Sequence, residues 1–184
     1  MDLITDKLAA NIANTGAPQR GFEELGYIFD IKGMTQSRVT PSSNVITDLV
    51  PVGAALAYTV KICGLQPFTG TMIEGVQQLA TMLFKGTASL VVVGNTPASA
   101  TIINGLANGR YVLVLVQKGV NDNSKFFAMG SEIGLKLTAA TFESYSEADG
   151  WTVTMVEELA INAATFVYKT SVADTQALLT GLLT

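Results

Sequence analysis

Side chains that commonly perform catalysis are scarce in this sequence. The chain has no histidine, which removes Ser-His and Cys-His nucleophile pairs, histidine metal ligands and the commonest general base. Its single cysteine, Cys63, excludes an internal disulfide and a zinc-binding cysteine cluster. Cys63 sits in the apolar pattern of Tyr58, Val60 and Ile62, which predicts a buried free thiol. Most enzyme classes are therefore disfavoured.

Two pairs of adjacent acidic residues are the remaining candidates for acid–base chemistry. They are Glu23 with Glu24, and Glu157 with Glu158. Adjacent residues in a strand point to opposite faces, so the two carboxylates of a pair could not act on one substrate. We expect both pairs to be solvated strand ends.

The segment 121–123 (Asn-Asp-Asn) resembles part of a calcium-binding loop, but the spacing to Glu132 lacks the glycine and the bidentate acid that such a loop needs. A turn is favoured. The GSEIG segment after Met129 is too short for a phosphate-binding glycine loop and is interpreted as a bend. The sequence therefore predicts no catalytic, cofactor-binding or metal-binding residues.

Aromatic side chains could form a stacking platform for sugars or single-stranded nucleic acid. They occur at strand spacing without interleaved arginines, which favours a place in the core. The residues are Tyr27, Phe29, Phe126, Phe127, Phe142, Trp151, Phe166 and Tyr168.

The composition indicates a protein with extensive contacts to partners. Charged residues make up 14% of the 184, against a usual value of about 25%, so a monomer could not easily cover its surface with polar groups. The net charge is -4, and the 11 basic residues are scattered, which disfavours attraction to nucleic acid. The chain contains neither a long apolar run nor a signal-peptide pattern, so we expect a soluble protein made in the cytoplasm, without membrane contact.

The stretch 110–137 predicts the centre of the fold. The apolar run 111–116 is rich in β-branched residues and predicts a strand covered on both faces. The turn cluster 119–124 allows the chain to return through 126–129 as the paired strand of a hairpin. Gly130 and Gly134 then predict a sharp bend.

Further strands are expected at 26–32, 45–50, 54–63, 83–93, 133–142 and 151–157. The segments 45–50 and 54–63 should pair as a hairpin, and 83–93 should be fully buried. The segment 64–83 is interpreted as a strand followed by a turn. Thr96 and Pro97 begin a helix that Gly109 can end in the left-handed conformation. Ser171 caps a short C-terminal helix.

These elements predict an α+β fold that is mainly β, in which a curved antiparallel sheet closes as a β-barrel or sandwich. One helix flanks the sheet, and a short helix ends the chain. Residues 1–22 are expected to form an N-terminal arm. Residues 23–184 are expected to form a single domain with a long loop at 33–44.

From about residue 21 the chain resembles the tail tube, or major tail, proteins of tailed bacteriophages of the type found in Bacteroides-like phages and prophages. The similar segments are GFEELGYIFDI, VVVGNTP before a helix, NGRYVLVLVQKG and FFAMGSEIGLKLTAA. The resemblance implies a tail-tube-like β-barrel or sandwich with a flanking helix. It also implies subunits that form rings, commonly hexameric, which stack into a conduit for DNA and are joined by arms and a long loop.

We therefore expect a non-enzymatic virion structural protein, made in the host cytoplasm, that forms a homo-oligomer and contacts other tail or neck proteins. DNA would be bound only in transit. One alternative is a head-to-tail joining (neck) protein that forms a single ring. A less favoured alternative is a carbohydrate-binding β-sandwich.

Overall fold

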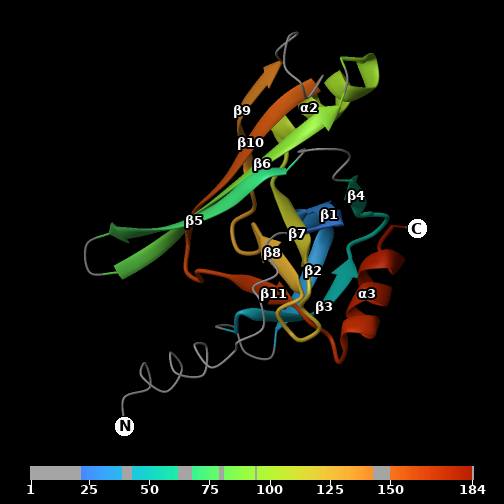
Figure 1. The fold of residues 1–184 in the computed structure, drawn as a ribbon, viewed down its shortest axis with the longest axis vertical. Helices are drawn as coiled ribbons and strands as arrows, with labels where there is room; N and C mark the ends of the chain where they lie inside the picture. Colours follow the sequence, from blue (N-terminus) through green and yellow to red (C-terminus); the bar gives the residue numbers. More distant parts are fainter. Residues whose placement is uncertain are drawn as a thin grey trace.

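The computed structural model describes residues 22–38, 43–61, 68–78, 81–93, 95–142 and 150–183. In these residues the chain forms eleven strands, two α-helices and one short 3-10 helix. The strands make a seven-stranded and a four-stranded sheet, stacked as in Figure 1. The fold is thus mainly β with two helices, as predicted. The described strand pairs close neither sheet into a barrel.

The seven-stranded sheet is antiparallel except for one pair. Its order is β2-β3-β11-β8-β7-β1-β4, and only β3 and β11 run parallel. A 3-10 helix, η1 (Ile31–Gly33), links β1 to β2. The strands are β1 (Phe22–Asp30), β2 (Met34–Arg38), β3 (Val45–Pro51), β4 (Tyr58–Lys61), β7 (Tyr111–Gln117), β8 (Phe126–Met129) and β11 (Thr165–Val167).

Strand β7 lies near the middle of this sheet and is buried on both faces. Residues 112–116 each expose 2% or less of their surface. The chain turns after Gln117, whose backbone N–H donates to the Lys125 carbonyl (2.8 Å), and returns as β8 with Val116 opposite Phe126. The predicted central hairpin is therefore confirmed.

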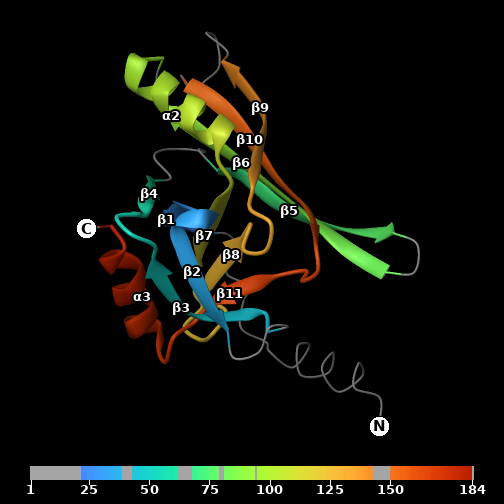
Figure 2. The same cartoon turned by 180° about the vertical axis from the view of Figure 1, so that it is seen from behind.

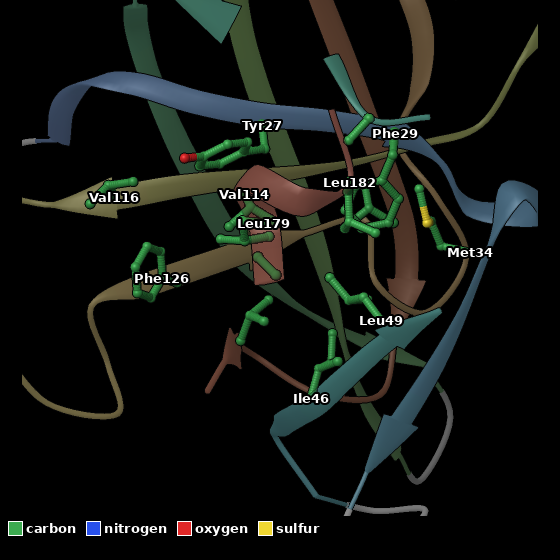
Figure 3. Close-up of a cluster of buried hydrophobic side chains, with 14 residues drawn as sticks. Tyr27, Phe29, Met34, Ile46, Leu49, Val114, Val116, Phe126, Leu179 and Leu182 are labelled. Atoms are coloured by element: carbon green, nitrogen blue, oxygen red, sulfur yellow. The ribbon is translucent and has the colours of Figure 1, made fainter. Parts of the chain in front are cut away.

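One face of the seven-stranded sheet packs against the C-terminal helix α3 (Val172–Gly181). Figure 3 shows Tyr27 and Phe29 of β1 and Val114 of β7 facing Leu179 of this helix, and all four side chains are buried. Ser171 caps the helix by accepting a hydrogen bond from the backbone N–H three residues later, as its position in the sequence predicted.

The other face packs against the four-stranded sheet, whose order is β5-β6-β10-β9. Leu113 and Leu115 of β7 share this second core cluster with Val153 and Met155 of β10 and with Leu106 of α2. All pairs in the four-stranded sheet are antiparallel. Its strands are β5 (Phe68–Gln78), β6 (Thr81–Val93), β9 (Lys136–Phe142) and β10 (Gly150–Ala160), and the helix that crosses to β7 is α2 (Pro97–Asn108).

Helix α2 begins as predicted but ends differently. Thr96 and Ser99 form a capping box, and Pro97 lies between them in the first turn. Gly109 has φ -110°, so the predicted left-handed end is wrong, because the chain passes directly into β7 in extended conformation. Glycine is needed there for space, since a Cβ would lie 2.5 Å from the Tyr111 ring.

The crossover from β8 to β9 carries the chain from one sheet to the other. Gly130 and Gly134 have φ of 80° and 87°, a region that L side chains rarely adopt. A Cβ on Gly130 would also lie 2.3 Å from the Tyr111 carbonyl oxygen. The predicted sharp bend is confirmed, and we call residues 130–134 the crossover loop.

Two predictions about the first third of the chain are wrong. The segment 33–44 is not one long loop, because 34–38 form β2, an edge strand whose polar residues face solvent while Met34 is buried. The segments 45–50 and 54–63 do not pair with each other. Instead β3 pairs with β2 and β11, and β4 pairs with β1, because contacts between distant parts of the chain decide the pairing.

Strand β6 is not fully buried, contrary to expectation. Ala88 and Leu90 are buried while Ser89 between them is only half-buried, because only one face of β6 packs on the core. The expected strand within 64–83 is present as β5. Of the arm predicted at 1–22, Phe22 belongs to β1, and residues 1–21 lie outside the described residues, as do Cys63 and the segments 79–80 and 143–149. No helix in the described part of the chain is long and apolar enough to cross a membrane.

Candidate assembly surfaces

One face of the four-stranded sheet points away from the core and carries hydroxyl side chains. Thr154 lies opposite Ser89, and Thr152 lies opposite Thr141. These side chains are exposed or half-buried, whereas Val153, between the two threonines of β10, is fully buried. Alternation along β10 thus separates an apolar inner face from a neutral polar outer face.

The same sheet has two edges, β5 and β9, with no further strand paired to them among the described residues. An unpaired edge offers a row of backbone N–H and C=O groups to another chain. Because four strands alternate in direction, β5 and β9 run opposite to each other. If neighbouring copies are related by rotation about an axis that runs along the strands, β5 of one copy can therefore pair with β9 of the next only in the antiparallel sense.

The β5–β6 hairpin extends beyond the rest of its sheet, as Figures 1 and 2 show. β10 pairs with β6 only from residue 84 to residue 93, so residues 76–78 and 81–83 pair only within the hairpin. Met82 in this two-stranded part is 52% exposed, and Met72 and Ile73, where β10 still pairs with β6, are 55% and 39% exposed. A two-stranded ribbon gains little stability alone, and exposed apolar side chains on β5 and β6 are available for contact with another molecule.

A second apolar surface lies between β3 and β4, and we call it the 50–58 surface. Val50, Val52, Leu56 and Tyr58 are 49%, 54%, 43% and 67% exposed. In both views β3 and β4 lie on the opposite side of the molecule from the β5–β6 hairpin. The chain therefore carries separate apolar surfaces on opposite sides.

A buried carboxylate fixes the crossover loop. Glu157 of β10 is only 7% exposed. Its Oε2 accepts the backbone N–H of Gly130 (2.9 Å), and its Oε1 accepts those of Glu132 (3.1 Å) and Ile133 (3.0 Å). Three backbone donors can satisfy a buried carboxylate, so Glu157 ties the four-stranded sheet to the loop that enters it.

The crossover loop in turn holds the chain that leaves β10. The Glu132 carboxylate accepts the backbone N–H groups of Ile161 (2.6 Å) and Asn162 (3.2 Å), and also the Asn162 side-chain amide. The two carboxylates therefore act in series: Glu157 positions the loop that carries Glu132, and Glu132 positions the turn towards β11.

Between these two anchored points the end of β10 forms an irregular segment. The register with β6 shifts between Glu157 and Ala160, and Leu159 has φ 64°, an uncommon conformation for a bulky residue. Leu159 is 38% exposed and Ile161 is 74% exposed. We call the pair Leu159 and Ile161 the bulge surface.

The acidic pairs behave only partly as expected. Glu157 is buried while Glu158 is exposed, so the two point to opposite faces, but Glu157 is not a solvated strand end. The side chains of Glu23 and Glu24 lie outside the described residues. A signal for the burial of Glu157 was available, because the two glycines of GSEIG leave free backbone N–H groups that an anion can bind.

The turn at 121–123 forms as expected. The Asp122 carboxylate accepts hydrogen bonds from the Ser124 hydroxyl (2.5 Å) and backbone N–H (2.8 Å). These bonds, the hydroxyl first, lower the pKa of Asp122 below its ordinary value. The carboxylate is thus used within its own turn.

Six of the eight aromatic residues contribute to the core, as predicted, whereas Phe142 and Tyr168 belong to neither core cluster. Four are buried and four are half-buried. Phe127 stacks on Phe22 and contacts Phe166 at a tilt, while Phe142 contacts Trp151. These contacts leave little aromatic surface for sugar or base stacking. The buried four are Tyr27, Phe29, Phe126 and Phe127, and the half-buried four are Phe142, Trp151, Phe166 and Tyr168.

The described residues contain no group of three or more potential metal ligands. No protein-family model, curated protein or solved structure matches this chain.

Proposed function

We propose that this protein is a virion structural subunit that assembles with copies of itself into stacked rings, forming a tail tube through which DNA passes. The observation that carries the proposal is the four-stranded sheet, which combines two open edges with an exposed neutral face. The resemblance of the sequence to tail tube proteins supports the same function.

Rings follow from pairing β5 of one copy with β9 of the next. The contact joins two different surfaces, and such a head-to-tail contact generates a closed ring when the rotation closes. Glu74 on β5 and Lys136 on β9 give the two edges opposite charge, which favours the encounter of the two edges. In such a ring the four-stranded sheets of all copies would join into one closed β-barrel, which a single subunit does not form. Six subunits per ring would agree with what the resemblance to tail tube proteins implies.

The hydroxyl face would line the inside of the ring. Neutral side chains such as Thr152 and Thr154 hydrogen-bond water without gripping phosphate groups, and the net charge of -4 per chain disfavours DNA retention. Binding of duplex DNA should therefore stay weak at low salt, where attraction to phosphate is strongest. Tight, strongly salt-dependent binding would favour an attachment role at the neck.

The neck protein remains the alternative from the same class, because one ring uses the same edge contact as a stack of rings. Electron microscopy of the purified protein separates them: tubes support the tail tube, and uniform single rings support the neck. A species that sediments only near 19.4 kDa at tens of micromolar would contradict both.

Proline scanning of β9 tests the edge contact itself. Adjacent strand residues direct their N–H groups to opposite sides, so of Ala139→Pro and Ala140→Pro one removes a donor to β10 and the other removes a donor to the open edge. The variant that removes a donor to β10 should lose stability. The variant that removes a donor to the open edge should keep the wild-type melting temperature yet remain a monomer. If the folded variant still forms rings, β9 does not make the ring contact.

A further inference from the structure

The edge strand β5 carries different chemistry on its two faces. Ile73 lines a small recess together with buried Met129 of β8, so its side chain points to the inner face, towards the seven-stranded sheet. The next residue, Glu74, is exposed and points to the outer face, because adjacent strand residues alternate. β5 therefore presents an apolar side chain inward and an acid outward.

The edge strand β9 alternates in the same way with a base in place of the acid. Leu137 lies opposite Met155 of β10 and packs on the second core cluster, so it points inward. Lys136 is exposed and points to the outer face. A shift of one residue between paired strands exchanges their faces, so only every second alignment of β5 with β9 keeps the inner faces of two copies together.

Three alignments meet this condition and also pair every residue of β9 with β5, given the lengths of the two strands. They differ in which residues of β5 lie opposite Lys136 and Leu137. The residue opposite Lys136 would be Glu74, Val76 or Gln78, and the residue opposite Leu137 would be Ile73, Gly75 or Gln77.

We infer that Glu74 of one copy lies opposite Lys136 of the next, and that this pair sets the alignment of the ring contact. Only this alignment joins opposite charges, and only this one brings two large apolar side chains, Ile73 and Leu137, together on the inner face. Ile73 is 39% exposed and Leu137 is half-buried, so both can still be covered. Opposite charges and apolar side chains that face each other stabilise an antiparallel pair.

The alignment also gives Glu74 a lysine on each side. Within its own hairpin Glu74 lies opposite Lys85 of β6, and Lys136 of the neighbouring copy approaches it across the open edge. The acid between two bases lowers the repulsion that the lysines would otherwise exert on each other. The charges on the outer face therefore largely compensate one another where two copies meet.

This inference rests on the proposed function, because it concerns the same contact, and exchange of charges tests it. Glu74→Lys and Lys136→Glu, both at exposed positions, should keep the wild-type melting temperature. Each should raise the concentration needed for ring formation about tenfold or more, because like charges then meet at every contact. Glu158→Lys, at an exposed position of β10, is the control and should assemble normally.

A mixture of the two variants gives the stronger result. In alternating order every contact again joins a lysine to a glutamate, so Glu74→Lys mixed with Lys136→Glu should form rings at a concentration where neither variant forms them alone. Sedimentation and negative-stain images measure this. Rings from either variant alone at the wild-type concentration would overturn the inference, and so would a mixture that assembles no better than its components.

Disulfide mapping reads the alignment directly, after Cys63 has been replaced by serine. Positions 73 and 137 lie on opposite edges of one sheet, so a disulfide between them joins two copies. Ile73→Cys/Leu137→Cys should cross-link on mild oxidation. Gly75→Cys/Leu137→Cys and Gln77→Cys/Leu137→Cys should not, because residues two positions out of line are too far apart.

The outcomes of this mapping separate the inference from the proposed function. Cross-linking through position 75 or 77 in place of 73 would overturn the alignment and leave the ring proposal intact. Wild-type protein without rings would contradict the proposed function. Cross-linking of Ile73→Cys/Leu137→Cys between copies would then still support the edge contact, and its absence would overturn the inference as well.

Discussion

Strands β7 and β6 have similar apolar sequences but opposite surroundings. VLVLV in β7 is buried on both faces, whereas β6 buries Ala88 and Leu90 and leaves Met82 half exposed. The difference arises because β7 lies between α3 on one side and the four-stranded sheet on the other. An apolar strand thus marks the core only where layers cover both faces. Elsewhere one face of the strand stays partly exposed.

The sharpest test of this difference places the same charge in each region. Val114→Asp should abolish folding, because an unpaired carboxylate would enter a site with 0% exposure, at a cost of several kcal/mol. Thr152→Asp, on the exposed face of the four-stranded sheet, should fold normally. Circular dichroism melting measures both, and equal effects would mean that β10 at Thr152 is covered as completely as β7 at Val114.

Two glycines with positive φ give the next largest contrast. Gly130→Ala should destabilise the protein by about 3 kcal/mol or more, since the strain of positive φ adds to a 2.3 Å overlap with the Tyr111 carbonyl. Gly53→Ala, with φ 66° and nothing within 4 Å of its Cβ, should cost about 1 kcal/mol. Urea unfolding gives the free energy of unfolding of both variants. A similar loss of stability in each would mean that the close contact between position 130 and the Tyr111 carbonyl contributes nothing.

Replacing the buried carboxylate of Glu157 should have a smaller effect on stability. The effect should spread from the crossover loop through Glu132 to Ile161, and not in the reverse direction. Glu157→Gln replaces one acceptor by a donor that faces a backbone N–H, which should cost about 1–3 kcal/mol. Hydrogen exchange should accelerate at Gly130 and Ile133, and also at Ile161 through Glu132.

Two matched variants give the controls for that result. Glu132→Gln should accelerate exchange at Ile161 and Asn162 only, because it leaves the bonds made by Glu157 intact. Glu158→Gln, at an exposed position of the same strand, should change neither stability nor exchange. Unchanged exchange at Ile161 in Glu157→Gln would disprove the series arrangement of the two carboxylates.

The smallest expected effect concerns the turn outside both sheets. The pKa of Asp122 is lower in the folded protein than in the unfolded chain, so its contribution to stability is complete above the unfolded pKa and is lost as the pH falls through the folded pKa. Ser124→Ala should return the carboxyl titration towards the ordinary value. NMR titration measures the shift, and an unchanged titration in the variant would assign the effect to another group.

Local signals in the sequence predicted the local elements. The β-branched run of β7, the Thr96 and Ser171 helix caps and the glycine pair 130 and 134 each appear where expected. Each depends on residues within a few positions of one another. Edge strand β2 was missed because its polar sequence has only one buried residue, Met34.

Pairing between distant segments could not be predicted in the same way. The segment 45–50 was predicted to pair with 54–63, which follows it, yet β3 pairs with β2 and with β11, and β11 lies more than one hundred residues later in the chain. The burial of Glu157 has the same origin, because its hydrogen-bond donors come from a loop 24 to 27 residues earlier. Loop closure and packing decide such contacts, and no short pattern encodes them.

The parallel pair of β3 and β11 also has a consequence for biosynthesis. Val45 and Ile46 align with Phe166 and Val167, so the ribosome must produce nearly the entire described chain before the seven-stranded sheet can be completed. Until then β3 has only β2 as a neighbour, and one edge of β3 stays open to wrong partners. Such late closure slows folding and prolongs the need for protection by chaperones. It also delays the time at which a newly made chain can complete its fold.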